Sequence, residues 1–590
     1  MSAMQGSVRE RVPAGRAGRL PRHVRVMLRL SRRDLPEPVC SVAVERGIEV
    51  PAGDGVTLLT DHYVPLIDGP RPTLLVRSPY GRGFPWDYVY GALFAGQGFH
   101  VVIQSCRGTG GSGGEHDPFR HEAADGQAAV AWLRQQEWFG GALGTVGASY
   151  LGYTQWALAT DPPPELGAMV VQVGSDDFHG FLYPGGAFAL ESTLVGTAAM
   201  LSMDRGFARF LRAIVRLLRR HRRVERTLPL IDAYPAAFGR RVAFFEQWLA
   251  HPEPGDPYWA SRRATAAAEL IPPTSLLTGW SDVCLDPTLR LFRRLREAGR
   301  EVRLIVGPWN HASGFNDDLP VVFGEAIRWL RAHLCGDRSD LPQQPVRVHV
   351  GEIGGPGQWR DLPDWPPPGV RAQPWHLNGD GTLAADPPAR AALSSFHYDP
   401  AAPTPSVGGP SMDSRNARPR RNNALEARPD VLVFTSAALS EPLDVIGPVS
   451  VRLQARASSP HFDIFARLCD VDPQGRSWNI CDGLVRLGGG TTAATAGAGS
   501  GDQPWSAITV PMSATAHRFG AGHRLRVQIS GGAHPRFARN TGTGDPLATA
   551  TRLVPVDIEI GHGASQPCLL SLPAAAADRT SLSAQPTARH

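Results

Sequence analysis

Short apolar runs alternate with helical stretches over the first third of the chain. Four such runs stand at residues 73–76, 100–104, 143–146 and 168–173. A helical stretch covers residues 123–136, between the second and the third run. Alternation of buried strands with helices is typical of a mostly parallel sheet covered by helices. The pattern returns later, where we expect a strand at 275–278, a helix at 287–298, a strand at 302–306 and a final helix at 324–333.

The spacing of apolar positions is helical between residues 176 and 270. Because this stretch separates the two parts of the sheet, we expect it to form a cap. Within it the pattern predicts one amphipathic helix, with Phe207, Phe210, Leu211, Ile214, Leu217 and Leu218 on one face and Arg205, Arg209, Arg212, Arg216, Arg219 and Arg223 on another. The arginines are expected to form a solvated face, with binding to an acidic surface or partner as the alternative.

The period of the pattern changes to two from about residue 345. Apolar and polar residues alternate at 346–350, 449–455 and 525–529. This alternation predicts strands with one buried face, as in a β-sandwich. The expected organisation is a disordered basic tail (1–40), an α/β domain in two parts (41–175 and 271–344), a helical cap (176–270), a β-sandwich (345–573) and a loose tail (574–590), with a mobile low-complexity loop at 488–501.

One sharp turn in the α/β pattern carries a serine at its apex. Gly147-Ala148-Ser149-Tyr150-Leu151-Gly152 follows the run at 143–146 and precedes a helical stretch at 151–159. A strand–turn–helix of this kind lifts the hydroxyl clear of the sheet and places the next backbone N–H beside it. An acyl-transfer nucleophile needs both groups, because the attacked carbonyl must meet a nucleophile and an oxyanion donor together.

Two further residues follow strands in the order that a serine nucleophile requires. Asp282 comes after the strand at 275–278, and His311 comes after the strand at 302–306. In open α/β sheets the functional residues lie at the edge formed by the carboxyl ends of the parallel strands. We therefore predict that His311 is the general base for Ser149 and that Asp282 orients the imidazole. Asp286, directly before Pro287, is expected to be the N-cap of the next helix, which leaves Asp282 free.

These segments resemble the cocaine esterase and X-Pro dipeptidyl-peptidase group of serine hydrolases, the CocE/NonD family. Matching segments include Gly147 to Gly152, Gly279-Trp280-Ser281-Asp282, Gly307-Pro308-Trp309-Asn310-His311, Arg77-Ser78-Pro79-Tyr80-Gly81 and His534-Pro535-Arg536-Phe537. The resemblance implies an α/β-hydrolase domain with a C-terminal jelly-roll, galactose-binding-like β-sandwich. It also implies that the Tyr80 hydroxyl and the Tyr150 backbone N–H bind the oxyanion. Ser105-Cys106 stands where the family usually has an aspartate before Arg-Gly-x-Gly, so the local loop is expected to differ.

The amino-acid composition excludes several catalytic mechanisms and classes of binding partner. The sequence contains no lysine, which excludes Schiff-base, pyridoxal-phosphate and Ser-Lys mechanisms and is typical of a GC-rich bacterial genome. Residues 1–33 carry nine arginines against one acid, so the basic charge belongs to the tail, and we expect no nucleic-acid partner. The literal G-x-G-x-x-G at 108–113 does not open a helix, which argues against a dinucleotide. We expect no cofactor and no metal site.

The cysteines and the apolar runs indicate the cellular compartment of the protein. Seven scattered cysteines without a C-x-x-C pair favour reduced thiols and a cytoplasmic protein. No signal peptide and no apolar run long enough to span a membrane is apparent. The sequence leaves open whether the chain forms a homo-oligomer.

The resulting functional hypothesis is a serine hydrolase that cleaves a small carboxylic ester or amide through an acyl-enzyme. The alternatives are an X-Pro dipeptidyl-peptidase or amino-acid ester hydrolase, and a non-catalytic binding protein with a relict hydrolase domain. Candidate groups for an ammonium are Asp176, Asp177, Glu191 and Asp204. Candidates for an apolar acyl pocket, or simply for core, are Phe178, Phe181, Tyr183, Phe188 and Trp280.

Overall fold

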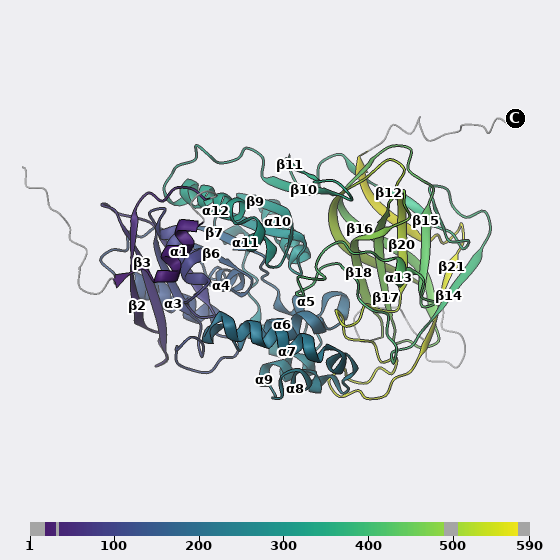
Figure 1. The fold of residues 1–590 in the computed structure, drawn as a ribbon, viewed down its shortest axis with the longest axis horizontal. Coiled ribbons are helices and arrows are strands. Elements are labelled where there is room, and N and C mark those ends of the chain that lie inside the picture. Colours follow the sequence, from purple (N-terminus) through teal and green to yellow (C-terminus); the bar gives the residue numbers. More distant parts are fainter. Residues whose placement is uncertain (1–17, 31–34, 489–504, 576–590) are drawn as a thin grey trace, which may run out of the picture.

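The computed structural model describes residues 18–30, 35–488 and 505–575. The expected low-complexity loop, apart from Gly488, and the outer parts of both expected tails lie outside the described residues. A catalytic sheet with its helices forms one half of the molecule, and a β-sandwich forms the other (Figure 1). Cap helices lie along one side of the junction between the two halves (Figure 1).

The catalytic sheet is mixed at its edges and parallel in its centre. Its strands are β1 (Gly18–Arg19), β2 (Ser41–Pro51), β3 (Thr57–Leu66), β4 (Thr73–Ser78), β5 (His100–Ser105), β6 (Leu143–Ala148), β7 (Leu166–Gln172), β8 (Thr274–Ser281), β9 (Val302–Asn310), β10 (Val346–Glu352) and β11 (Gln358–Leu362). Their order in space is β1-β2-β3-β5-β4-β6-β7-β8-β9-β10-β11, and β5 to β10 run parallel. The strands β4, β5 and β6 are buried along their whole length, as parallel strands covered on both faces must be.

Helices cover both faces of this sheet. Leu75 and Val102 share one core with residues of α3 (Glu122–Leu133), α4 (Tyr150–Leu158) and α10 (Leu285–Glu297). Their neighbours Leu74 and Val101 share the opposite core with α12 (Leu319–Leu334), η1 (Asp87–Ala92) and α2 (Leu93–Ala95). Successive strand residues point to opposite faces, so one strand contributes to both cores. The predicted α/β architecture is confirmed.

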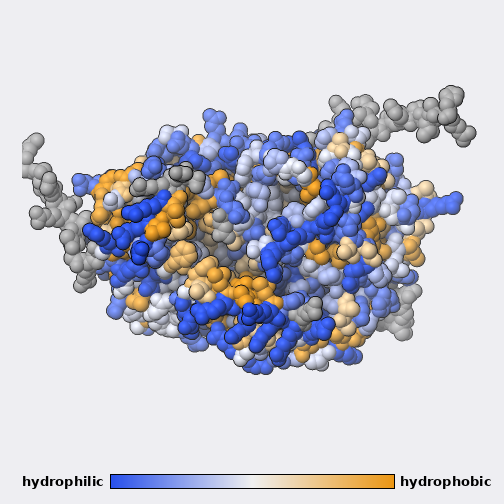
Figure 2. Space-filling model, viewed as in Figure 1, coloured by the Kyte–Doolittle hydropathy of each residue, from blue (hydrophilic) through white to orange (hydrophobic). Residues whose placement is uncertain are grey.

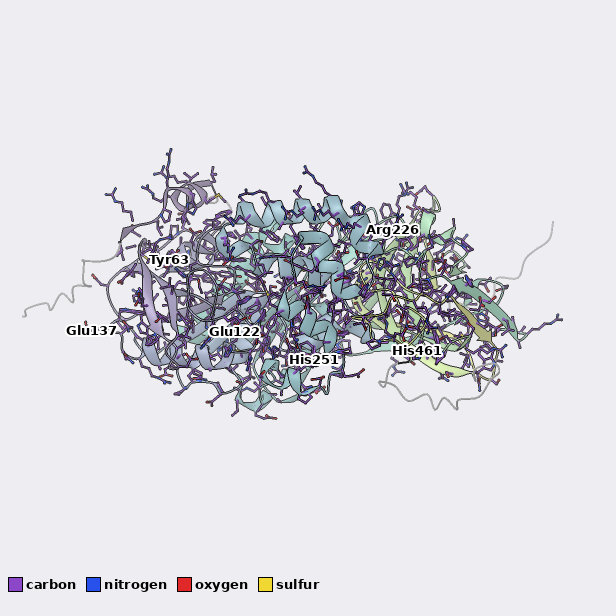
Figure 3. The ribbon with its side chains drawn as sticks, turned by 90° about the horizontal axis from the view of Figure 1, so that it is seen from below. Tyr63, Glu122, Glu137, Arg226, His251 and His461 are labelled. Carbon is purple, nitrogen blue, oxygen red and sulfur yellow. The ribbon has the colours of Figure 1, made fainter. Side chains whose placement is uncertain are left out.

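The cap is inserted between β7 and β8, as the helical spacing predicts. Its α-helices are α5 (Phe178–Leu182), α6 (Leu190–Met200), α7 (Phe207–Arg226), α8 (Ala233–Phe238) and α9 (Ala243–Ala250). In the longest, α7, every arginine whose side chain the structure describes is exposed, and most of the apolar residues are half-buried. Arg226, at the end of α7, lies toward the β-sandwich (Figure 3), and there the Glu225 carbonyl lies 3.1 Å from Nε2 of His534.

The described part of the β-sandwich has eleven strands. These are β12 (Val370–Leu377), β13 (Thr382–Ala384), β14 (Ala392–Tyr398), β15 (Val431–Ser436), β16 (Leu443–Ala457), β17 (Asp463–Val471), β18 (Ser477–Arg486), β19 (Ser506–Phe519), β20 (Arg524–Ser530), β21 (Val556–His562) and β22 (Leu569–Ala575), with the short helix α13 (Asn423–Glu426) before β15. One layer holds β15, β20, β17 and β18, and the other is centred on β16 with β19, β21 and β22 beside it. Val451 and Leu453 of one layer and Val527 and Ile529 of the other are buried in a common core, which confirms the predicted alternation.

Three expectations are corrected by the structure. Residues 18–30, expected to be disordered, form β1 and the helix α1 (Arg22–Leu30), because Leu20 and Val24 are buried against the catalytic domain. The alternating strand β10, expected to begin the sandwich, pairs in parallel with β9 over Val346–Val348 and extends the catalytic sheet, and only its last residues, Gly351 and Glu352, pair with β19 of the sandwich. A period of two shows that one face is buried but not which sheet the strand joins.

The third correction concerns Asp286. The N-cap of α10 is Cys284, so Asp286 lies within the first turn of the helix. Its carboxylate accepts a hydrogen bond from Ser513 of β19 at 2.9 Å, which joins the catalytic domain to the sandwich. Burial raises the pKa of this carboxyl above its usual range.

Candidate active site

Ser149 stands in a strained turn between β6 and α4. Its backbone has φ 59° and ψ −121°, and its N–H donates to the Gln172 carbonyl at 2.9 Å. Positive φ is uncommon for a residue with a side chain and is found at functional turns. The turn is tight because a Cβ on Gly147 would lie 2.5 Å from Cβ of Leu151, and a Cβ on Gly152 would lie 3.1 Å from Cα of Gly174. Small residues at both positions therefore let α4 leave the sheet with Ser149 at its start.

Ser149, His311 and Asp282 form one hydrogen-bonded chain, although they lie far apart in the sequence. Nε2 of His311 is 3.0 Å from Oγ of Ser149, and Nδ1 of His311 is 2.8 Å from Oδ1 of Asp282. Asp282 is almost fully buried and accepts further bonds from Oγ1 of Thr278 at 2.8 Å and from the Cys284 N–H at 3.1 Å. An ionised carboxylate only accepts, so Nδ1 carries the proton and Nε2 offers its lone pair to the serine hydroxyl.

Two hydrogen-bond donors converge beside the serine. Tyr80 follows β4, and its ring packs edge-on against the ring of Tyr150, with centroids 6.4 Å apart. Burial raises the pKa of Tyr80 to about 12, against the smaller lowering effects of hydrogen bonds with the Ser149 side chain and the Tyr150 backbone. The phenol therefore stays protonated at neutral pH and able to donate. The Tyr150 N–H is in the first turn of α4, where backbone donors have no helical partner.

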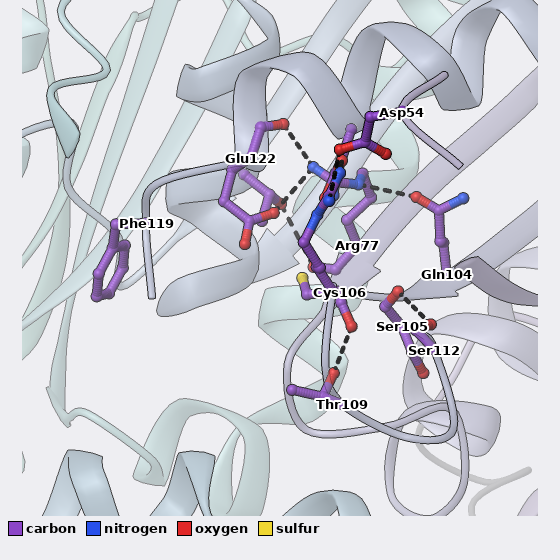
Figure 4. Close-up of polar contacts among 12 residues, drawn as sticks. Asp54, Arg77, Gln104, Ser105, Cys106, Thr109, Ser112, Phe119 and Glu122 are labelled. Atoms are coloured by element: carbon purple, nitrogen blue, oxygen red, sulfur yellow. Dashed lines mark hydrogen bonds and ion pairs between the residues drawn. The ribbon is translucent and has the colours of Figure 1, made fainter. Parts of the chain in front are cut away.

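A buried ionic cluster holds the segments that carry both donors (Figure 4). The Tyr150 hydroxyl donates to Oε1 of Glu122 at 2.8 Å, and Glu122 pairs with Arg77 of β4 at 2.9 Å. Asp125 lies 3.6 Å from Arg77 and 2.6 Å from Arg107. Breaking a buried ion pair leaves an uncompensated charge, so the cluster resists relative movement of β4, α3 and α4. No sequence pattern predicted a role for Glu122, Asp125 or Arg107.

Ser105 and Cys106, where the family usually carries an aspartate, lie next to this cluster (Figure 4). Oγ of Ser105 accepts from Arg82 at 2.6 Å, and Arg82 pairs with Asp61 at 3.0 Å. Burial, reinforced by the negative charge of Glu122, raises the pKa of the Cys106 thiol well above its usual range. The neighbouring glycine-rich segment folds as a tight turn, in which Gly108 and Gly110 have positive φ.

A cavity of about 1620 Å³ opens over Ser149 and His311. Its walls come from η1, α1, α6, α7 and the loop after β9, together with residues 406–420 of the C-terminal half. Apolar side chains in the wall include Phe84, Trp86, Phe207, Phe210, Leu211, Ile214, Leu217 and Leu218. The apolar stripe predicted on the cap helix therefore faces the site.

The residues expected to form an acyl pocket lie elsewhere. Phe178, Phe181, Tyr183, Phe188 and Trp280 are absent from the described lining of this cavity. Phe178 stacks on Phe119 with ring centroids 3.7 Å apart, and Trp280 donates to the His349 carbonyl at 2.6 Å. They belong to the packed core, which was the alternative interpretation.

The four acidic candidates for binding an ammonium are mostly occupied. Asp176 pairs with Arg294 at 2.9 Å, and Asp177 caps α5 by accepting from the Gly180 N–H at 2.9 Å. Asp204 faces the Gly110 N–H at 3.4 Å. Glu191 alone among the four lines the cavity, and its carboxylate accepts from Ser411 and from the Asp413 N–H. Burial raises the pKa of Glu191 above its usual range.

Asp317, an acid outside the predicted candidates, also lines the cavity and is exposed at its rim. It stands six residues after His311, in the short helix α11 (Ser313–Asp317). Its closeness to His311 in the sequence was the one signal that could have suggested a place near the site, but only the fold shows which acids after the histidine line the cavity.

One group of side chains has the donors of a metal site. Ligand atoms of Asp282, Cys284 and His311 lie within 4.8 Å of one another, the one such group found among the described residues. However, burial and the charge of Asp282 raise the pKa of the Cys284 thiol well above its usual range, and metals bind the thiolate. Asp282 and His311 are also already hydrogen-bonded to each other. The donor chemistry therefore fits a proton relay better than a metal centre.

The fold and this site define a class. A parallel sheet with a serine at the turn after a central strand, followed in chain order by an acid and a histidine at later strand ends, is the α/β-hydrolase arrangement. The chain is a serine hydrolase of that fold. This favours the enzyme over the alternative of a non-catalytic binding protein.

Comparison with known proteins gives the family. Residues 54–313 match the model of X-Pro dipeptidyl-peptidase (S15 family), and residues 340–564 match that of the X-Pro dipeptidyl-peptidase C-terminal non-catalytic domain. The chain is 31% identical over 545 residues to cocaine esterase from Rhodococcus sp. (strain MB1 Bresler), a match that covers 86% of this chain and 94% of that protein. The chain therefore belongs to the CocE/NonD family of serine hydrolases.

Solved structures agree on the architecture. An aminopeptidase from the marine sediment archaeon Thaumarchaeota archaeon superposes with a TM-score of 0.74 at 20% identity, covering 90% of this chain and 97% of that one. An α-amino acid ester hydrolase superposes with a TM-score of 0.73 at 20% identity, covering 91% and 97%. At this identity the likeness shows the shared fold: a hydrolase domain with a helical insertion and a mostly β C-terminal domain.

Proposed function

We propose that this chain hydrolyses carboxylic esters with an apolar acyl or aryl group, through an acyl-enzyme on Ser149. The observation that carries the proposal is the succession Asp282, His311 and Ser149, with contacts of 2.8 and 3.0 Å, on a cavity walled largely by aromatic and aliphatic side chains. His311, oriented by Asp282, can take the serine proton. The apolar wall suits a substrate without a charged anchor.

The proposed reaction runs in two halves. Oγ of Ser149 attacks the carbonyl carbon while Nε2 of His311 takes its proton, and the tetrahedral oxyanion lies between the Tyr80 hydroxyl and the Tyr150 N–H. Collapse releases the alcohol, which receives the proton from His311. Water activated by His311 then attacks the acyl-enzyme, and a second collapse releases the acid and restores Ser149.

X-Pro dipeptidyl-peptidase or amino-acid ester hydrolase activity is the second candidate. Such substrates carry a free ammonium, which needs a carboxylate in the cavity, and the acids in its lining are Glu191, Glu225, Asp317, Asp318 and Asp413. Asp413 pairs with Arg415, and Asp318 accepts a hydrogen bond from Nε1 of Trp309. Glu191 is already engaged by Ser411 and the Asp413 N–H, which favours the uncharged ester. Asp317 lies at the exposed rim, where an ion pair contributes little.

A substrate panel tests the proposal. Purified protein is assayed with p-nitrophenyl acetate and butyrate, Ala-Pro-p-nitroanilide and phenylglycine methyl ester, with Ser149→Ala as the blank and fluorophosphonate labelling of Ser149 as the count of active sites. We expect the p-nitrophenyl esters to have the higher kcat/KM and Ser149→Ala to be inactive and unlabelled. Higher kcat/KM on the anilide or on the amino ester, lost in Asp317→Asn, would favour the second candidate.

We also propose a cytoplasmic location. All seven cysteines are unpaired, and five of them are buried, which fits a reducing compartment. In the described part of the chain, no helix combines the length and the apolar character needed to cross a bilayer. Mass-spectrometric mapping of thiols in protein taken directly from cells is expected to find every cysteine reduced, and a native disulfide would contradict this location.

A further inference from the structure

Exposed apolar side chains gather where the cavity opens to solvent. Val26, Leu30, Phe84, Leu211 and Val215 are large apolar residues that are between 41% and 71% exposed. Leu30, Phe84 and Leu211 also line the cavity. In the space-filling view, hydrophobic surface lies on either side of a hollow, over α1 and along α7 (Figure 2). Contiguous apolar surface of this kind marks a site of interaction.

Phe84 links the apolar residues of α1 to those of α7. The ring of Phe84 lies 6.0 Å from that of His23 on α1 and 5.8 Å from that of Phe207 on α7. Phe84 therefore joins the two helices, although they are far apart in the sequence. We call the surface of α1, Phe84 and α7 around the opening the mouth face.

The mouth face is bordered by arginines that have no acidic partner in the described part of the chain. They are Arg22, Arg25 and Arg29 on α1 and Arg209, Arg212, Arg216, Arg219, Arg220, Arg223 and Arg226 on α7, all exposed. None lies within 4 Å of a carboxylate among the described residues. Like charges one turn apart on a helix repel, so this arrangement is unfavourable unless something anionic meets it.

Apolar and basic positions alternate along one side of α7. Arg212, Val215 and Arg219 follow one another at steps of three and four residues, with Arg226 a further two turns on. A groove of about 390 Å³ lies between α7 and the helices α6 and α8. Its lining includes Arg205, Arg209, Arg212, Arg216 and Arg240. A helix with arginines beside exposed aliphatic residues is suited to the boundary between lipid headgroups and acyl chains.

We propose that the mouth face docks on the surface of a membrane that contains anionic phospholipid. Val26, Leu30, Leu211 and Val215 enter the headgroup boundary, and the arginines meet lipid phosphates. A second copy of the chain fits poorly, because a symmetric contact would bring arginines against arginines. An acidic protein would satisfy the arginines but not the apolar residues between them. Docking goes beyond the proposed function and does not require Ser149.

Vesicle flotation tests the proposal. The probes are vesicles of phosphatidylcholine alone and of an equimolar mixture with phosphatidylglycerol, at low and high salt. The test variant is Arg212→Gln/Arg219→Gln/Arg226→Gln. The control is Arg371→Gln/Arg390→Gln/Arg452→Gln, which removes the same charge from exposed positions on the sandwich. None of these six side chains lines the described catalytic cavity.

We expect the chain to bind the mixed vesicles only, and salt to weaken this binding. The α7 variant should bind about 100-fold more weakly, because each arginine near an anionic surface strengthens binding about fivefold. The control variant and Ser149→Ala should bind like the parent chain, and the α7 variant should keep its turnover of a soluble ester, which shows that it is folded. Val26→Glu/Val215→Glu should also weaken vesicle binding.

Three results would overturn the proposal: equal binding to both vesicle types, equal weakening in the two arginine variants, or self-association in sedimentation that the α7 variant loses while vesicles are not bound. The last would assign the mouth face to a second copy. Because Ser149→Ala is a binding control, loss of docking and loss of esterase activity are scored separately.

Discussion

At the scale of single residues, the site depends on one buried phenol that stays protonated and on side chains that hydrogen bonds hold in place. Tyr80 is buried enough that its pKa rises to about 12, so its hydroxyl is a donor over the whole neutral range. Asp282 is held by Thr278 and the Cys284 N–H as well as by His311, which fixes its carboxylate beside the imidazole. Ser149 takes a backbone conformation that few residues with side chains adopt. These features are local, and each can be tested by one substitution.

Tyr80→Phe removes one of the two proposed oxyanion donors and little else. We expect kcat to fall by about 100- to 1000-fold with a smaller change in KM, because the donor acts mainly on the charge of the transition state. Tyr398→Phe, which removes a buried tyrosine hydroxyl in the sandwich, is the matched control and should keep parent kinetics. An unchanged kcat in Tyr80→Phe would show that the oxyanion is bound by other groups.

At the scale of elements, the position of the nucleophile depends on how closely α4 approaches β6. Gly147 of β6 packs against Leu151 of α4, and Gly152 of α4 packs against Gly174, which follows β7. The cluster of Arg77, Glu122 and Tyr150 ties the start of the same helix to β4 and α3. The strand–turn–helix is therefore held from two sides, by close backbone packing and by buried charge.

Gly147→Ala tests the packing side. The added Cβ would lie 2.5 Å from Cβ of Leu151, so α4 must shift and carry Ser149 with it. We expect a loss of about 100-fold in kcat/KM, the effect of a displacement on the order of 1 Å in a catalytic group, and a lower melting temperature. Gly196→Ala in α6 is the control, since no atom lies within 4 Å of its Cβ; it should gain roughly 0.5–1 kcal/mol in stability. Parent kinetics in Gly147→Ala would contradict this account of the turn.

At the scale of the whole molecule, the two halves meet around the cavity and share its walls. Residues 406–420 of the C-terminal half line it beside α6, and Ser513 bonds Asp286 of the catalytic half. His534 stands at the same junction, with Nε2 3.1 Å from the Glu225 carbonyl at the end of α7. Burial, with a smaller effect of Arg539, lowers the pKa of His534 to about 4. Nδ1 of His534 also lies 3.2 Å from the Phe537 carbonyl, and the two carbonyl contacts oppose, without cancelling, the lowering of the pKa by burial.

Acid should weaken this junction through His534. Its pKa in the folded state is below the ordinary value of 6.5, so the unfolded chain binds the proton more readily, and stability is lost as pH falls from about 6.5 to about 4. Relative to His534→Gln, the parent should lose about 1.4 kcal/mol of unfolding free energy per pH unit in that range. Denaturant unfolding of both proteins between pH 7 and 4 measures the difference, with exposed His397→Gln as control. A difference that does not vary with pH would contradict the assignment.

Much of the site could be predicted from local pattern because its parts are local. A strand followed by a glycine-flanked serine and a helix, and an acid and a histidine just after later strands, indicate positions at one sheet edge wherever those strands pair. The apolar stripe from Phe207 to Leu218 likewise predicted a helix with one face turned inward. The resemblance added Tyr80 and the Tyr150 N–H as oxyanion donors, which the geometry supports and kinetics must test.

The expectations that failed concern contacts between segments far apart in the chain. The tertiary structure decided that Phe178 and Trp280 belong to the core, that β10 extends the catalytic sheet, and that residues 22–30 form a helix beside the cavity. It also decided that Glu191 is held by Ser411 and that α1 and α7 meet at Phe84. The sequence by itself determined which residue types stand at each turn and which faces are apolar, because both follow from backbone geometry over a few residues. What each face packs against was decided only by the tertiary structure, because burial is a property of all segments together.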